Sequence, residues 1–383
     1  MSWKVGITLA LDVPVLDQAN GSAVLLPDIE GAARRAELHY VARDAPGIRR
    51  LRIGKGFRYV LPNGKRVTDA ETLARIRSLA IPPAWQDVWI CADENGHLQA
   101  TGKDARGRVQ YRYHPRWREV RDEAKYNDVV AFARSLPRLR RRVQNDLRHR
   151  RLTKDKVLAT VLGVMERTCI RVGNDRYADT NHSYGLTTLL DRHARVGRDS
   201  VEFSFRGKGG KAYRARVRDA RLAAIVKRCR DIPGQRLFQY EGDDGEYRAI
   251  TSTDVNDYLK STMGRPFTAK TFRTWAGTLA TAVLLADERL PAQGKSGERT
   301  VRRAIERVAE QLGNTATVCR KSYVHPAVVN AWRDGALSTL ARRRTGRGAS
   351  SPGLRPEERA VLDVLTRRTS RPRSARAAAR RRH

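Results

Sequence analysis

Three cationic residues lie next to glycines or at the ends of predicted helices, where a positively charged side chain could reach a bound phosphate. Arg171 opens an Arg-Val-Gly-Asn segment directly after a predicted helix, Lys208 stands in a glycine-rich turn, and Arg273 lies within 270–277. Guanidinium and ammonium groups stabilise negative charge on a phosphoryl group. Each of the three could also serve as a salt-bridge partner or a solvated surface charge.

A tyrosine hydroxyl would complete this set as the nucleophile of phosphodiester cleavage. The chain contains twelve tyrosines, and residue chemistry alone does not select one of them. The sequence has no phosphate-binding Gly-x-x-x-x-Gly-Lys-Ser/Thr loop, no His-Glu-x-x-His pair and no EF-hand loop. Its four cysteines are at least 60 positions apart, form no zinc pattern and are expected to be reduced thiols. We therefore expect no cofactor and no metal.

The charge of the chain agrees with a phosphate-rich partner. Its 383 residues include 76 Lys and Arg against 41 Asp and Glu, which gives a formal net charge of +35. Binding of a polyanion to such a surface releases counterions and thereby gains affinity. No apolar run reaches the roughly 18 residues of a membrane span, and residues 1–18 lack a signal-peptide pattern. The sequence predicts a cytoplasmic, nucleoid-associated protein without a membrane partner.

The first part of the chain has the pattern of a small, mainly β domain. Residues 1–30 form an extension with little pattern, and residues 31–118 contain the strand signals. The predicted elements are strands at 57–61, 88–91 and 97–101, a turn at Pro62-Asn63-Gly64 and a helix at 70–79 that Asp69 caps.

Residues 119–341 are predicted to form a mostly helical domain. Leu158, Val161, Leu162, Met165 and Cys169 follow the spacing of one helix face. A β-hairpin with a basic tip is predicted at 201–217, and helices are predicted at 219–230, 252–262, 268–287 and 298–312.

The remaining residues, 342–383, contain 14 arginines and three acidic residues. We predict a largely disordered basic tail with a short helix at 356–366. The expected fold class is therefore α+β, with a mainly β N-terminal domain, a mostly α-helical domain with a small hairpin sheet, and this tail.

Between residues 40 and 335 the chain resembles the type IB DNA topoisomerases, in particular their short bacterial and poxvirus-like form. The resemblance rests on five ordered segments: Ile-Pro-Pro-Ala-Trp at 81–85, Arg-Val-Gly at 171–173, Gly-Lys-Gly at 207–209, Lys-x-x-Arg-Thr at 270–274 and Lys-Ser-Tyr at 321–323. It implies that Tyr323 is the nucleophile and that Arg171 and Arg273 bind the phosphate oxygens. It also implies Lys208 as the general acid, with Lys270 as the alternative source of that proton.

The segment 104–114 resembles the part of the same family that contacts DNA bases and backbone. This resemblance implies that Gln110, Tyr111, Arg112 and Tyr113 contact DNA, and we expect Lys211 of the hairpin to do the same. In a strand, Tyr111 and Tyr113 would share one face, which favours a joint role. The two tyrosines could instead pack against the sheet.

One position departs from the family pattern. The family usually has a histidine nine residues before the tyrosine, and this chain has Asn314 there. An asparagine amide can donate a hydrogen bond to a phosphate oxygen, but it carries no charge. We therefore expect activity with weaker charge stabilisation.

The activity that the resemblance implies is relaxation of positive and negative DNA supercoils through a 3′-phosphotyrosine intermediate, without ATP or metal. The partner would be double-stranded DNA, held by a monomer that closes around the duplex as a clamp. Two alternatives stay open. A tyrosine recombinase shares the Arg, Lys, Arg, Tyr set, although its second segment typically has histidine two or more places before the arginine, and here Lys270 stands three places before Arg273. A DNA-packing protein would need only the charge and the tail.

Overall fold

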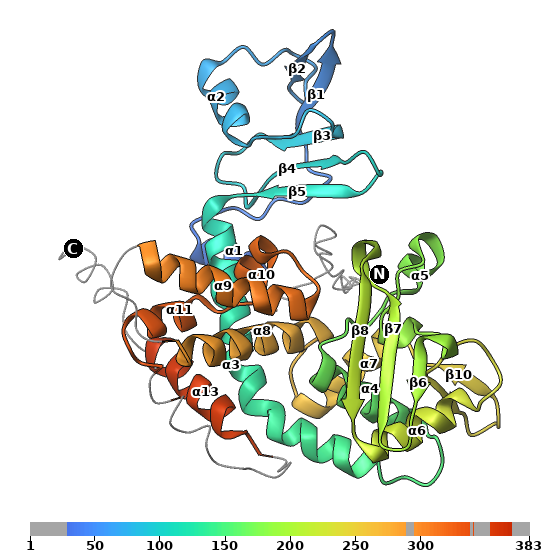
Figure 1. The fold of residues 1–383 in the computed structure, drawn as a ribbon. Coiled ribbons are helices and arrows are strands. Elements are labelled where there is room, and N and C mark those ends of the chain that lie inside the picture. Colours follow the sequence, from blue (N-terminus) through green and yellow to red (C-terminus); the bar gives the residue numbers. More distant parts are fainter. Residues whose placement is uncertain (1–28, 289–294, 338–339, 341–352, 370–383) are drawn as a thin grey trace, which may run out of the picture. The chain divides into compact units, whose positions relative to one another are not determined.

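The computed structural model describes residues 29–288, 295–337, 340 and 353–369 (Figure 1). These residues form two compact units, which meet in the sequence between Asn127 and Asp128. The division lies within one helix, α3 (Pro115–Asp146). Residues 1–28 of the predicted extension, and 342–352 and 370–383 of the predicted tail, lie outside the described residues.

The first unit is built on a five-stranded antiparallel sheet with the strand order β2-β1-β3-β4-β5. Its core is small, because Ile48, Val88 and Ile90 of the sheet pack with Ile76 of α2. The Asp69 carboxylate accepts a hydrogen bond from the Thr72 amide and so begins α2 at the predicted place. The elements are α1 (Ile29–Arg35), β1 (Gly47–Ile53), β2 (Gly56–Val60), α2 (Ala70–Ser78), β3 (Gln86–Cys91), β4 (Leu98–Lys103) and β5 (Val109–Tyr113).

The first hairpin of this sheet was not predicted, whereas the turn that follows it was. The chain does fold back at the predicted turn, where the Leu61 amide donates to the Lys65 carbonyl and the Gly64 amide donates to the Leu61 carbonyl. The sequence did not predict that β2 pairs along its whole length with the preceding strand β1. The connection is the two-residue turn Gly54-Lys55, where Gly54 has a φ of +54° that favours glycine. After the predicted turn, a single bridge joins Val60 to Arg66.

The second unit is mostly helical, as predicted. The helices predicted at 219–230, 252–262, 268–287 and 298–312 are present as α6, α7, α8 and α9. Its helices are α4 (Lys154–Thr168), α5 (Asp175–Asn181), α6 (Ala220–Arg230), α7 (Ser252–Met263), α8 (Ala269–Ala286), α9 (Lys295–Leu312), α10 (Ala316–Ser322), α11 (Pro326–Arg333) and α13 (Pro356–Thr369).

Helix α4 is more deeply buried than its sequence pattern predicts. The apolar spacing predicts one buried face, but every residue from Lys156 to Met165 is buried. The helix packs against α6, α7, β8 (Ala212–Arg218) and β9 (Gln239–Glu241), and it is therefore the centre of the unit. The buried Lys156 ammonium donates to the His149 carbonyl, and the Thr160 hydroxyl donates to the Lys156 carbonyl. These bonds offset the cost of burying polar groups there.

The predicted hairpin is the longest part of a three-stranded antiparallel sheet with the order β6-β7-β8. Val201, Phe203 and Phe205 alternate with exposed residues along β7, and their face packs on α6. The chain then turns at 208–210 and returns as β8. The strands are β6 (Ala194–Val196), β7 (Ser200–Arg206) and β8 (Ala212–Arg218), and a separate pair consists of β9 (Gln239–Glu241) and β10 (Tyr247–Ala249).

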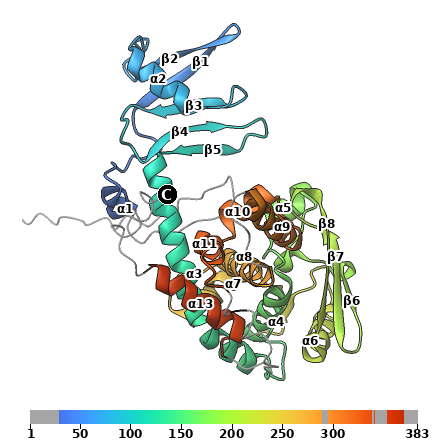
Figure 2. The same cartoon turned by 60° about the vertical axis from the view of Figure 1, so that its left-hand side comes forward.

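The short helix predicted in the Arg-rich tail is present as α13, and it belongs to the second unit. Its residues Ala360, Val361 and Leu365 are buried, and it packs against α8 and α11 (Figures 1 and 2). Glu358, which is 2% exposed, binds the Arg140 guanidinium of α3 through both carboxylate oxygens, at 2.7 and 2.8 Å. This part of the tail is therefore a structural component.

Candidate active site

Four of the predicted site residues line one cavity of the second unit. The cavity has a volume of about 620 Å³, and Arg171, Lys208, Lys211 and Asn314 are among its lining residues. It lies between the tip of the β7–β8 hairpin, the segment after α4 and the connection from α9 to α10. Basic groups that are far apart in the sequence thus converge on one concave surface.

Arg171 is held by the end of α4 and by Asn314. Helix α4 stops where Cys169 takes a left-handed conformation with a φ of +55°, and the chain then turns to Arg171. The Arg171 Nη2 donates to the Asn314 Oδ1 at 2.5 Å and to the Gly313 carbonyl at 3.3 Å. Burial and the nearby Arg273 cation lower the pKa of Arg171 to about 10, so this side chain stays cationic at neutral pH.

Arg273 is the most deeply buried cation of the predicted site, with 3% of the residue exposed. From α8, its guanidinium donates to the Cys169 carbonyl and, at 2.6 Å, to the Leu312 carbonyl. It therefore ties the end of α4 to the end of α9. Its carbon Cζ lies 5.3 Å from the centre of the Tyr323 ring, which places this cation against the predicted nucleophile.

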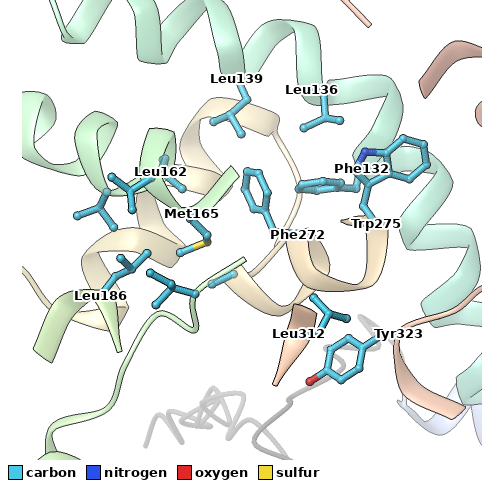
Figure 3. Close-up of a cluster of buried hydrophobic side chains, with 14 of the residues drawn as sticks. Phe132, Leu136, Leu139, Leu162, Met165, Leu186, Phe272, Trp275, Leu312 and Tyr323 are labelled. Atoms are coloured by element: carbon cyan, nitrogen blue, oxygen red, sulfur yellow. The ribbon is translucent and has the colours of Figure 1, made fainter. Parts of the chain in front are cut away.

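Tyr323 follows the last turn of α10 and is 8% exposed. Its ring lies at the edge of the buried core beside Leu312 (Figure 3). Gly277 of α8 lets the helix approach closely, because a Cβ there would stand 2.6 Å from the Tyr323 carbonyl oxygen. The Thr278 hydroxyl donates to that same oxygen at 3.3 Å. Helix α8 thus fixes the backbone of the tyrosine and also carries Arg273.

The predicted lysines stand on two different elements. Lys208 lies in the turn at the tip of the β7–β8 hairpin, where Gly209 and Gly210 both have a φ of +76°, and it is exposed. Lys211 is also exposed, at the start of the returning strand. Lys270 is partly buried in the first turn of α8, three residues before Arg273, and it is not among the residues that line the cavity.

Two hydrogen-bond donors of the site are buried without a partner in the described part of the chain. They are the Asn314 Nδ2 and the Arg273 Nε. The other end of the same Asn314 amide, its Oδ1, accepts a hydrogen bond from Arg171. Buried donors are usually satisfied, and a donor left open in a cationic pocket is typical of an oxyanion site. The described residues contain no group of three His, Cys, Asp or Glu side chains that could hold a metal ion.

Sequence reasoning missed several residues that line the cavity, among them the cations Arg214 and Arg307 as well as Tyr213, Glu306 and Glu310. The two glutamates and Asn314 follow each other at intervals of four, so helical spacing could have placed the carboxylates on the face that leads to Asn314. Tyr213 lies opposite Phe205 in the hairpin, and the alternation along its strand could have placed its side chain on the inward-facing side of the sheet.

The residues predicted to contact DNA in the first unit lie on β5, which is an edge strand of its sheet. The rings of Tyr111 and Tyr113 are stacked, with centroids 5.9 Å apart and planes 8° apart. Gln110 donates to the Asp104 carboxylate, and Arg112 donates to the Ala80 carbonyl. The stacked tyrosines share one face, as the alternation predicts.

Comparisons with known proteins agree with this arrangement. The family described as "Eukaryotic DNA topoisomerase I, catalytic core" matches residues 114–342, and "Bacterial DNA topoisomerase IB, N-terminal domain" matches residues 56–104. The chain is 31% identical to DNA topoisomerase 1B of Acanthamoeba polyphaga mimivirus over 285 residues, which is 73% of this chain and 85% of the viral protein. It is 20% identical to DNA topoisomerase I of Monkeypox virus over 247 residues, 64% of this chain and 75% of that protein.

None of the described helices is long and apolar enough to cross a membrane. The matched catalytic core covers more than half of the sequence, and the mimivirus enzyme aligns with most of it. The chain therefore belongs to the type IB family of DNA topoisomerases and is an isomerase that acts on DNA.

Proposed function

We propose that this enzyme relaxes positive and negative supercoils by cutting one DNA strand, letting it swivel and resealing it, without ATP or metal. The observation that carries the proposal is the arrangement around Tyr323. The Arg273 cation lies against its ring, and Arg171 is hydrogen-bonded to Asn314 in the adjoining cavity.

In the cleavage step, the Tyr323 oxygen forms a bond to a backbone phosphorus while the bond from phosphorus to the 5′ oxygen breaks. The tyrosine loses its proton, and the departing oxygen takes one up to become a 5′-hydroxyl. The product is a 3′-phosphotyrosine ester. Negative charge develops on the phenol oxygen as its proton leaves, and nearby cations stabilise that charge. Arg273 and Arg171 are the cations here.

The transition state carries extra negative charge on the non-bridging phosphate oxygens. Arg171, Arg273 and the open Nδ2 of Asn314 are the donors that would bind those oxygens. Lys208 is our candidate for the proton donor to the 5′ oxygen, because it lines the cavity from the hairpin. Lys270, one turn before Arg273, is the alternative donor.

Resealing is the reverse reaction. The phosphotyrosine ester replaces one phosphodiester bond with another of similar energy, so the 5′-hydroxyl can attack it without an outside energy source. Between the two steps the cut strand rotates about the intact one. The direction of rotation follows the torsion in the DNA, and supercoils of both signs therefore relax.

We also propose that the first unit contributes contacts to the same duplex. The stacked Tyr111 and Tyr113, with Gln110 and Arg112 beside them on β5, are the candidates, and Lys211 would add a phosphate contact in the second unit. A monomer that closes around the duplex as a clamp, on the chromosome in the cytoplasm, is the arrangement we infer.

The test is relaxation of supercoiled plasmid in EDTA without ATP, with wild type and Tyr323→Phe side by side. Reactions stopped with SDS should trap a covalent adduct at the 3′ side of the cut. We expect the wild type to relax both signs of supercoil and the variant to form no adduct. Exchange of strands between paired sites would instead favour a recombinase. Retention of plasmid binding by a well-folded wild type that never cuts would favour DNA packing.

A further inference from the structure

Tyr213 is a residue of the second unit that the mechanism above does not use. It stands on β8, five residues after Lys208, and it lines the same cavity as Arg171 and Asn314. Its position is fixed by contacts to three segments of the site, each of which carries a different proposed functional group.

The first contact is within its own hairpin. The Tyr213 ring stacks on Phe205 of β7, with centroids 5.3 Å apart, and the two residues face each other in the strand register. The next cross-strand pair, Arg206 and Ala212, leads directly to the turn that carries Lys208. The ring therefore packs within the hairpin one residue pair before the turn that carries Lys208.

The second contact reaches the end of α4. The Tyr213 hydroxyl donates to the Thr168 carbonyl at 2.6 Å, and the neighbouring Cys169 carbonyl accepts from Arg273. The carbonyls at a helix C-terminus have no partner within the helix. Tyr213 and Arg273 thus satisfy two successive carbonyls just before Arg171.

The third contact is with the loop that carries Asn314. A Cβ on Gly313 would lie 3.8 Å from the Tyr213 ring and 3.7 Å from the Arg171 guanidinium, so this glycine is packed between the two side chains. Burial raises the pKa of Tyr213, although the charges of Arg273 and Arg171 act in the opposite direction. Because its pKa is raised, the Tyr213 hydroxyl stays protonated and can donate a hydrogen bond.

We propose that Tyr213 is a positioning residue that holds the Lys208 hairpin in register with Arg171 and Asn314, so that Lys208 reaches the departing 5′ oxygen. Its hydroxyl is committed to the Thr168 carbonyl, and it therefore acts through the hairpin and not on the substrate. The proposal rests on the proposed function and on the role proposed there for Lys208.

A change of leaving group tests this role. The substrate is a duplex oligonucleotide that contains a cleavage site mapped with the wild-type enzyme, made once with oxygen and once with sulfur at the 5′ bridging position. A sulfur leaving group departs as a thiolate and needs no proton, since a thiol is far more acidic than an alcohol. A variant that has lost proton delivery should therefore regain its cleavage rate on the sulfur substrate. A variant that has lost phosphate binding should stay slow on both substrates.

Tyr213→Phe removes the hydroxyl and keeps the ring. On the oxygen substrate at saturating enzyme, we expect single-turnover cleavage to slow by about 10- to 100-fold, because a displaced catalytic group loses effective concentration steeply. On the sulfur substrate we expect a rate within about 3-fold of wild type, as for Lys208→Ala, because general acid catalysis is no longer needed. Arg171→Ala should stay slow on both substrates.

The control is Tyr177→Phe, which removes a hydroxyl from a half-exposed tyrosine of α5 and should change neither rate. An equal deficit of Tyr213→Phe on both substrates would overturn the proposal, because Tyr213 would then act on the phosphate-binding arginines. Cleavage of the oxygen substrate by Tyr213→Phe at the wild-type rate would overturn it as well. The proposal would also fail if Lys208→Ala cleaved the sulfur substrate as slowly, relative to wild type, as the oxygen substrate. Failure of the proposed function is distinguishable, because wild type itself would then not cleave.

Discussion

At the scale of single residues, the feature that sets this site apart from the family pattern is Asn314. Its amide has two different environments, because Oδ1 accepts from Arg171 at 2.5 Å while Nδ2 is buried and has no partner among the described residues. A histidine at this place could carry a charge, and an asparagine cannot. In the proposed mechanism, Arg171 and Arg273 are therefore the charged groups that bind the phosphate.

Two substitutions separate the contributions of Oδ1 and Nδ2 of Asn314. Asn314→Ala loses both, and we expect cleavage to slow by roughly 10²- to 10³-fold, as for loss of one oxyanion donor. Asn314→Asp keeps an acceptor for Arg171 but replaces the donor with a second acceptor, and it should be at least as slow. Single-turnover cleavage at saturating enzyme measures both, and near-wild-type cleavage by Asn314→Asp would show that donation from Nδ2 is not used.

At the scale of elements, α8 organises the site and α13 supports it. Helix α8 carries Arg273 and contacts the backbone of Tyr323 through Gly277 and Thr278. Helix α13 packs against α8 and α11 and is fastened by the buried ion pair of Glu358 with Arg140. The scaffold of the proposed nucleophile Tyr323 thus includes a helix beyond residue 342, where the match to the catalytic core of the family ends.

Glu358→Gln should therefore destabilise the second unit. Removal of one partner of a buried ion pair typically costs about 3–5 kcal/mol, and Glu166 still faces Arg140 here, so we expect a value near the lower end. Urea unfolding measures this decrease in the free energy of unfolding. The control is Glu357→Gln, which changes the same charge at the neighbouring, less buried position. Equal stability of the two variants would contradict a structural role of the ion pair.

The pH dependence of that loss has a definite sign. Burial alone would raise the pKa of Glu358, but its hydrogen bonds and charge interaction with Arg140 outweigh burial and lower the pKa below the ordinary value of 4.5. A carboxylate with a lowered pKa stabilises the fold above its unfolded pKa and loses this contribution as the pH falls through its folded pKa. The difference in the free energy of unfolding between wild type and Glu358→Gln should therefore have its full value near neutral pH and shrink below pH 4.5.

At the scale of the whole molecule, the dominant property is the net charge of +35. For duplex DNA, the logarithm of the binding constant falls with the logarithm of salt concentration by about 0.9 for each phosphate neutralised. Residues 370–383 contain six arginines and no acidic residue, so their removal lowers the net charge to +29. A chain that ends at Thr369 keeps α13 and the complete site.

We predict that this truncation weakens duplex binding at low salt and lowers the slope of the salt dependence by up to about 5, if all six arginines contact phosphates. Single-turnover cleavage at saturating enzyme should be unchanged. Fluorescence anisotropy with a labelled duplex across a salt series gives the slope. The same slope with and without these residues would mean that they make no phosphate contacts.

The sequence by itself determined the fold class, the family and most of the element positions. Helices at 219–230 and 268–287 follow from apolar periodicity and end signals, and the ordered segments around Arg171 and Tyr323 carry the resemblance. These features are local, because each depends on residues within one or two turns. They could be predicted without knowledge of which elements pack together.

Only the tertiary structure decided how these elements meet. The partner of β2, the all-round burial of α4 and the packing of α13 depend on contacts between distant segments, which no local pattern encodes. The same reason explains Tyr213, whose place on a strand is predictable but whose bond to the Thr168 carbonyl joins two elements 45 residues apart. Residue type and spacing determined the chemistry available to this protein, and packing across the chain decided which of those groups share one cavity.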